Sequence, residues 1–77
     1  MQIYGYQKDE ETLINLEEVS LHCTLEELDD IIGFLSKSRK EHAEVAEKTG
    51  MCHSHLRDWK QGWKQGEPDL IVITTFK

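Results

Sequence analysis

The stretch that decides the fold is Thr24-Leu25-Glu26-Glu27-Leu28-Asp29-Asp30-Ile31-Ile32-Gly33-Phe34-Leu35. Thr24 and Glu27 have the spacing of a capping box, in which each side chain hydrogen-bonds the other residue's backbone N–H. Apolar residues then recur at steps of three and four, as they do along one face of a helix. That apolar stripe consists of Leu25, Leu28, Ile31, Ile32 and Leu35. We therefore predict a helix that begins at Thr24 and covers a sheet with this stripe.

The helix has two possible ends. No strong helix breaker occurs between Leu35 and Gly50, although the apolar pattern thins beyond Ser36. Oppositely charged residues four apart, such as Lys40 and Glu44, support helix continuation through this stretch. One continuous helix to Lys48 is favoured over a break near Ser36.

Strands are expected on both sides of the helix. Residues Ile3–Tyr6 form a short aromatic strand, and residues 15–23 alternate apolar and polar side chains as a half-buried strand does. Leu70–Phe76 is apolar and β-branched on both faces, which is typical of a strand buried on two sides. The order predicts a single α+β domain over residues 1–77, a small β-β-α-β fold with a three-stranded, mainly antiparallel sheet and one long helix packed on one face. The other face of that sheet needs the loop, the tryptophans or a second subunit to cover it.

Composition narrows the classes of function. Fifteen acidic residues against nine Lys and Arg give a formal net charge of −6, which repels phosphate backbones and argues against a nucleic-acid partner. No apolar run approaches the roughly 18 to 20 residues that span a bilayer, so we expect no membrane partner. Two cysteines, Cys23 and Cys52, are far fewer than a disulfide-stapled secreted domain carries, and no signal-peptide pattern is present. These features predict a cytoplasmic protein.

The segment from Cys52 to Pro68 concentrates the chemically versatile side chains. It contains two histidines and the near-duplicate Trp59-Lys60-Gln61-Gly62 and Trp63-Lys64-Gln65-Gly66, without a sustained periodicity. We interpret it as an ordered recognition loop in which one tryptophan packs on the open sheet face and the other anchors a partner. The predicted partner-binding residues are His53, His55, Arg57, Trp59 and Trp63.

The residue types of this segment also suggest two other chemistries. Cys52, His53 and His55 are ligand types that zinc accepts, so a small zinc-binding module is the alternative function, although no second ligand cluster accompanies them. Cys52 beside His53 supplies a nucleophile and a base by type only, because adjacent residues seldom reach the required geometry. We therefore expect no catalytic residues, no enzyme activity and no cofactor.

The order of motifs resembles a family of small bacterial immunity proteins encoded beside polymorphic toxins. The matching motifs are Ile3-Tyr4-Gly5-Tyr6, Leu16-Glu17-Glu18-Val19, Thr24-Leu25-Glu26-Glu27-Leu28, His53-Ser54-His55-Leu56-Arg57-Asp58 and Pro68-Asp69-Leu70-Ile71-Val72. The tandem Trp-Lys-Gln-Gly segment has no match in that pattern. The resemblance implies a non-enzymatic α+β protein that binds and neutralises a cognate protein toxin inside the producing cell. The acidic charge agrees with a basic toxin such as a nuclease, and a homodimer contact through Leu70–Phe76 or the loop is compatible with this function.

Overall fold

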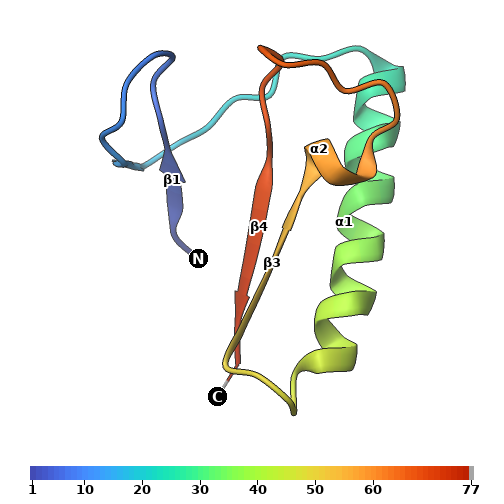
Figure 1. Cartoon of the computed structure of the whole chain (residues 1–77). Coiled ribbons are helices and arrows are strands. Elements are labelled where there is room, and N and C mark those ends of the chain that lie inside the picture. The colour runs from blue at the N-terminus through green and yellow to red at the C-terminus, as the bar shows by residue number, and fades with distance from the viewer. Residues whose placement is uncertain (77) are drawn as a thin grey trace.

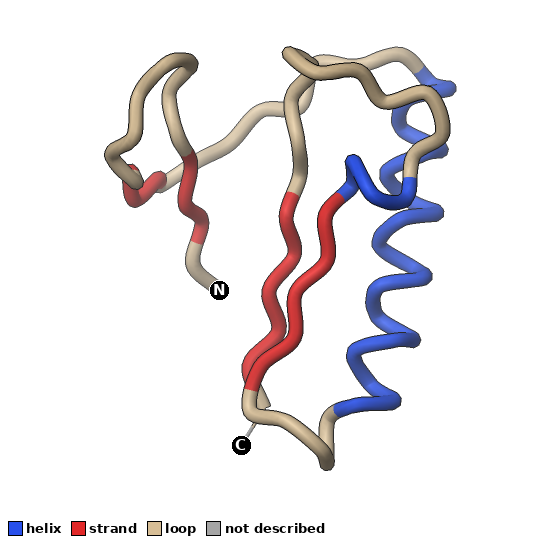
Figure 2. Tube along the Cα trace, in the orientation of Figure 1, coloured by secondary structure: helices blue, strands red, loops and turns tan. Residues whose placement is uncertain are grey.

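The computed structural model describes residues 1–76 (Figure 1). Along the chain its elements are β1 (Ile3–Gly5), β2 (Ile14–Leu16), α1 (Leu25–Val45), β3 (Met51–His55), α2 (Leu56–Trp59) and β4 (Ile71–Thr75). The strands form two separate two-stranded antiparallel sheets, β1–β2 and β3–β4. Figure 2 shows α1 lying along the β3–β4 sheet, with the β1–β2 hairpin standing apart from both. The α+β class is confirmed.

The start and the continuity of the long helix are also confirmed. Thr24 Oγ1 accepts from the Glu27 N–H at 3.1 Å, and Glu27 Oε1 accepts from the Thr24 N–H at 2.8 Å. The hydrogen bond from the Thr24 backbone N–H is the largest influence on the Glu27 carboxyl and lowers its pKa, and the Thr24 hydroxyl lowers that pKa further. The helix runs unbroken through Ser36 and ends at Val45, three residues short of the predicted end.

The predicted three-stranded sheet is wrong for the described residues. The strand expected over residues 15–23 stops at Leu16, and beyond it Val19 and Leu21 are each 53% exposed. The partner of β4 is instead β3, which lies within the segment expected to be a loop. The alternation of polar and weakly apolar residues in Met51–His55 gives no hydrophobic signal from which a strand could have been inferred.

The helix face that meets the sheet is not the predicted apolar stripe. The buried side chains of α1 are Phe34, Ser38 and His42, which recur every four residues. Four members of the predicted stripe are exposed: Leu25, Leu28, Ile32 and Leu35. The inner face of the β3–β4 sheet explains this choice, because it carries Ser54 and Thr74, whose hydroxyl groups hydrogen-bond His42.

The chain exposes far more surface than a compact protein of its size. Its accessible area is 6994 Å², against about 4,900 Å² expected for a folded monomer of 9.0 kDa. Its radius of gyration is 13.6 Å, against about 11.5 Å expected for 77 residues. Among the described residues, Phe34 is the one large apolar side chain that is fully buried. The chain thus exposes roughly 2,100 Å² more surface than the compact expectation.

Over residues 1–76, no helix combines the length and the apolar character needed to cross a membrane.

Candidate functional site

The outer face of the β3–β4 sheet, turned away from α1, is the candidate site. Antiparallel pairing sets Met51 opposite Thr75, His53 opposite Ile73, and His55 opposite Ile71. Because side chains alternate across a strand, these six residues share one face. Three large apolar side chains on it are about half exposed, namely Met51 at 58%, Ile71 at 47% and Ile73 at 59%. We call these six residues the outer face.

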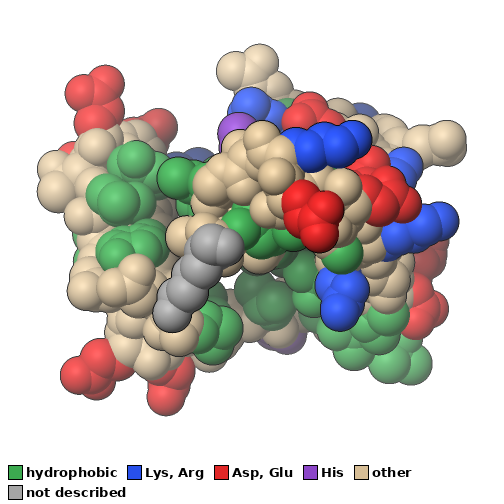
Figure 3. Space-filling model, turned by 90° about the horizontal axis from the view of Figure 1, so that it is seen from below, with side chains coloured by type: hydrophobic (Ala, Val, Ile, Leu, Met, Phe, Trp, Pro, Cys, Tyr) green, Lys and Arg blue, Asp and Glu red, His purple; other side chains and the backbone are tan. Residues whose placement is uncertain are grey.

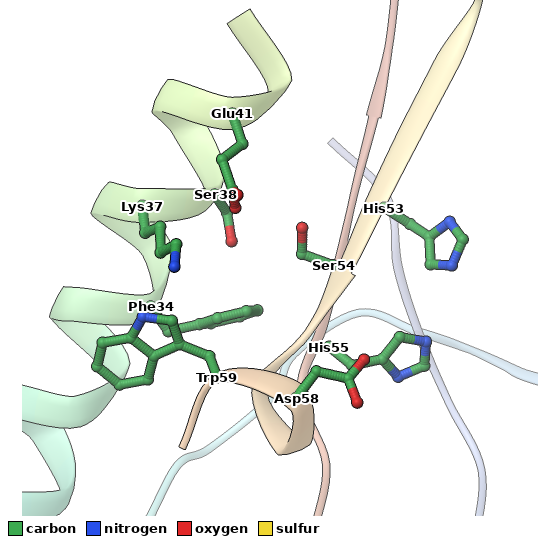
Figure 4. A pocket seen from close by; sticks show the side chains of 9 residues that line it. All are labelled: Phe34, Lys37, Ser38, Glu41, His53, Ser54, His55, Asp58 and Trp59. Carbon is green, nitrogen blue, oxygen red and sulfur yellow. The ribbon is translucent and has the colours of Figure 1, made fainter. Parts of the chain in front are cut away.

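The histidines of β3 belong to this face. Figure 4 shows His53 and His55 on the side of β3 away from α1, whereas the Ser54 hydroxyl turns toward the helix. The two imidazole rings meet edge to face with centroids 5.5 Å apart. The same view includes Lys37, Ser38, Glu41 and Asp58, which line an open groove of about 400 Å³ beside the strand.

A polar cluster around Asp69 organises the end of the outer face. His55 Nδ1 lies 2.7 Å from Asp69 Oδ2, and it is the donor because an ionised carboxylate only accepts. Asp69 Oδ1 accepts from the backbone N–H groups of Arg57 and Leu70, each at 3.0 Å. The Arg57 guanidinium adds a looser contact, with Nε 3.8 Å from Asp69 Oδ2. This carboxylate therefore ties the start of α2 to the residue that precedes β4.

These contacts change the acidity of Asp69. Partial burial is the largest single influence and raises the pKa of the carboxyl, but the hydrogen bonds from His55, Arg57 and Leu70 together outweigh it. The pKa of Asp69 in the folded protein consequently lies below its ordinary value of 3.8. A depressed pKa means that the ionised carboxylate stabilises the fold above pH 4 and that this contribution disappears as the pH falls through the folded-state pKa.

Asp69→Asn is expected to lower the free energy of unfolding by about 1–2 kcal/mol at pH 7, because the hydrogen bonds to a charged acceptor are weakened. The difference from the unsubstituted protein should begin to shrink below the ordinary pKa of 3.8, and it disappears only as the pH falls through the lower folded-state pKa of Asp69. Urea unfolding at pH 7, 5 and 3 measures it. Asp58→Asn is the matched control, since the Asp58 side chain is 74% exposed. A difference that stays constant down to pH 3 would contradict the assignment.

On the inner face of the sheet, a buried histidine of α1 hydrogen-bonds one hydroxyl group from each strand. His42 is 2% exposed, and its Nδ1 and Nε2 lie 2.7 Å from Thr74 Oγ1 and 2.9 Å from Ser54 Oγ. A neutral imidazole has one donor and one acceptor, and hydroxyl groups can serve as either, so both ring nitrogens are satisfied. Ser54 and His42 are the residue types of a nucleophile and its base, but the third group is a neutral hydroxyl rather than the carboxylate that orients the histidine of a Ser-His-Asp triad. The geometry is that of a side-chain network joining α1 to both strands.

The three residues of the alternative zinc site, Cys52, His53 and His55, do not converge on one point. Cys52 and His53 are adjacent in β3 and therefore project to opposite faces of the sheet. Within residues 1–76, no group of three His, Cys, Asp or Glu side chains is placed to hold a metal ion.

The predicted partner-binding residues divide into two groups. His53 and His55 lie on the outer face, and Arg57 joins its polar end. Trp59 instead packs on α1, where its ring centroid is 6.4 Å from that of Phe34. It approaches the backbone of Gly33 so closely that a Cβ there would lie 2.8 Å from the indole ring.

Trp63 closes the tandem segment on itself. Its indole Nε1 donates to the Pro68 carbonyl at 3.2 Å. Gly62 and Gly66 have positive φ angles of 77° and 100°, so the repeated glycines are turn positions. Neither tryptophan is on the outer face. In the tandem motif, Trp59 packs on α1 and Trp63 holds the loop that leads to Pro68.

Sequence reasoning missed Met51, Ile71 and Ile73 as site residues. The available signal was the doubly apolar Leu70–Phe76 stretch, which predicted a face in need of cover without telling which side chains would lie on it. No family model matches the chain, and neither a curated protein nor a solved structure matches it.

Proposed function

We propose that the protein is a non-enzymatic protein-binding module, an immunity protein that binds and neutralises a cognate bacterial toxin in the cytoplasm. The observation that carries this proposal is the uncovered outer face of the β3–β4 sheet. Met51, Ile71 and Ile73 are large apolar side chains spread over this face, and each is about half exposed. Protein interfaces likewise combine exposed apolar side chains with polar ones.

The polar groups beside these apolar side chains suit recognition. His53 lies directly beside Ile73, and His55 is held in one orientation by Asp69. A fixed side chain loses little conformational entropy when a partner binds, which favours affinity. The roughly 2,100 Å² of excess surface is also more than the ~800 Å² that each partner buries in an interface of standard size.

Charge and motif order suggest the kind of partner. The formal net charge of −6 favours a basic protein, because complementary charge speeds encounter and rejects acidic competitors. A nuclease toxin is such a protein, since it must itself bind a phosphate backbone. The resemblance of the motifs to small immunity proteins points in the same direction.

The test is co-expression of the chain with each protein encoded beside its gene in a bacterial host. One neighbouring protein is expected to arrest growth when expressed alone and to be tolerated when this chain is present. The two proteins should co-purify. If no neighbouring protein is toxic, bound or neutralised, the proposal is wrong.

Ile73→Asp locates the interface. A charge at the centre of the outer face is expected to weaken binding by at least about 30-fold, the effect of losing an interface hot spot. Leu13→Asp is the matched control, because Leu13 is 51% exposed on the connection of the β1–β2 hairpin. Circular dichroism verifies that both variants fold. Unchanged binding of Ile73→Asp would remove the outer face as the interface.

A further inference from the structure

A second apolar surface lies on α1 and does not belong to the outer face. Leu25, Leu28, Ile32 and Leu35, which we call the α1 row, are 81%, 40%, 55% and 42% exposed. Figure 3 shows hydrophobic side chains gathered at the lower right of the view, on the side of the molecule that α1 forms. Four large aliphatic side chains in one line on a helix are more than scattered surface residues.

The spacing of the α1 row is that of a helix-pairing seam. Its steps of three, four and three residues repeat the a and d positions of a heptad. At 100° per residue, the row is centred a little over a quarter of a turn away from the face that carries Phe34, Ser38 and His42. The helix can therefore pack on its own sheet and on another helix at the same time.

The charges of α1 occur in blocks along its length. The charged residues before Ile31 are all acidic, namely Glu26, Glu27, Asp29 and Asp30; the basic Lys37, Arg39 and Lys40 follow, and Glu41 and Glu44 lie nearer the end of the helix. Asp29 borders the α1 row one turn after Leu25, and Arg39 continues the row one turn after Leu35. Among the described residues, neither Asp29 nor Arg39 forms an ion pair within its own copy. A second α1 running in the opposite direction brings these unlike charges together, whereas a parallel one sets like charges side by side.

We propose that two copies of this chain form a homodimer in which their α1 helices pack antiparallel along the α1 row. With the two-fold axis near Ile32, Arg39 of one copy comes within about 6 Å, measured along the helix axis, of Asp29 of the other. An arginine side chain spans that distance. The contact is isologous, so it closes at two copies.

The surface area accommodates this dimer together with a second partner. An interface of standard size buries ~800 Å² per partner, well below the roughly 2,100 Å² that the chain exposes in excess. Because the outer face belongs to the other layer of the molecule, it stays free in the dimer. The dimer therefore does not depend on the proposed toxin.

Sedimentation of the purified full chain between about 1 and 200 µM is the direct test. We expect the mass to rise from 9.0 kDa toward twice that value as the concentration increases. Ile32→Asp is expected to raise the dissociation constant at least about 30-fold, and Ile73→Asp to leave it unchanged. A protein that remains monomeric at 200 µM overturns the proposal without any variant, and a dimer that survives Ile32→Asp with a native circular dichroism spectrum overturns the assigned surface.

Charge reversal tests the direction of the helices. Asp29→Lys and Arg39→Glu are each expected to weaken an antiparallel dimer, because each sets like charges against one another. The double variant Asp29→Lys/Arg39→Glu restores opposite charges and should dimerise like the unsubstituted chain. This rescue should fade in 0.5 M salt, which screens exposed pairs. Single variants that dimerise normally, or a double variant as weak as the singles, would exclude the antiparallel arrangement.

Discussion

Phe34→Ala is expected to lower the free energy of unfolding by about 3–5 kcal/mol, the usual cost of removing a buried phenyl ring. Phe34 is 1% exposed, the lowest value of any large apolar residue in residues 1–76. Its ring lies against Trp59, with the two ring planes inclined at 56°. Among residues 1–76, no other large apolar side chain is fully buried and could compensate for the loss. A domain of 77 residues has a total stability of roughly 4–12 kcal/mol, so this one substitution should remove at least about a quarter of the stability, and all of it at the low end of that range.

Urea unfolding followed by tryptophan fluorescence measures this effect and reports on the same contact. Phe34→Leu should lose much less stability than Phe34→Ala, because the leucine fills most of the space. Leu13→Ala is the exposed control and is expected to change the stability by less than about 0.5 kcal/mol. If Phe34→Ala were no more destabilising than Leu13→Ala, the packing of α1 on the sheet would have to be different.

His42→Leu should destabilise the protein by about 2–4 kcal/mol, although it replaces a polar side chain in the interior with an apolar one. The reason is that the Ser54 and Thr74 hydroxyl groups lose their partner and stay buried, at a cost of about 1–3 kcal/mol for each unsatisfied group. The substitution removes both hydrogen bonds that connect α1 to β3 and β4.

The triple variant His42→Leu/Ser54→Ala/Thr74→Val distinguishes this explanation from a simple packing effect. Removing all the polar partners together should recover most of the lost stability, because no orphaned hydroxyl group remains. His53→Leu, on the exposed outer face, is the control and should change the stability little. A triple variant as unstable as the single one would mean that His42 acts through its shape alone.

Local interactions made the start of α1 predictable. The capping box between Thr24 and Glu27 involves residues three apart, so its geometry depends on nothing distant in the chain. The same holds for the continuity of the helix through Ser36 and for the position of β4, whose β-branched run leaves few alternatives. His53 and His55 were expected in a loop, and only the observed strand β3 shows that they share one face.

The partner of β4 and the buried face of α1 were not predictable in this way. The alternation over residues 15–23 is a stronger hydrophobic signal than Met51–His55, yet the latter pairs with β4. Likewise the α1 row is more apolar than the row of Phe34, Ser38 and His42, yet the latter is buried. Sequence periodicity shows which helix face is the more hydrophobic. It does not show that His42 can hydrogen-bond two hydroxyl groups on the opposing sheet, those of Ser54 and Thr74.

The sequence by itself determined the class of the fold, the capped helix, the last strand and the acidic charge, because each rests on neighbouring residues or on composition. Only the tertiary structure decided that Trp59 packs on Gly33 and Phe34, that Cys52 and His53 point to opposite faces, and that Ile71 and Ile73 are left uncovered. These outcomes depend on hydrogen bonds and contacts between residues far apart in the chain, such as His42 with Thr74 and His55 with Asp69. The row of Phe34, Ser38 and His42 is buried in place of the more apolar α1 row, because a buried polar side chain such as His42 needs hydrogen-bond partners and the sheet supplies them.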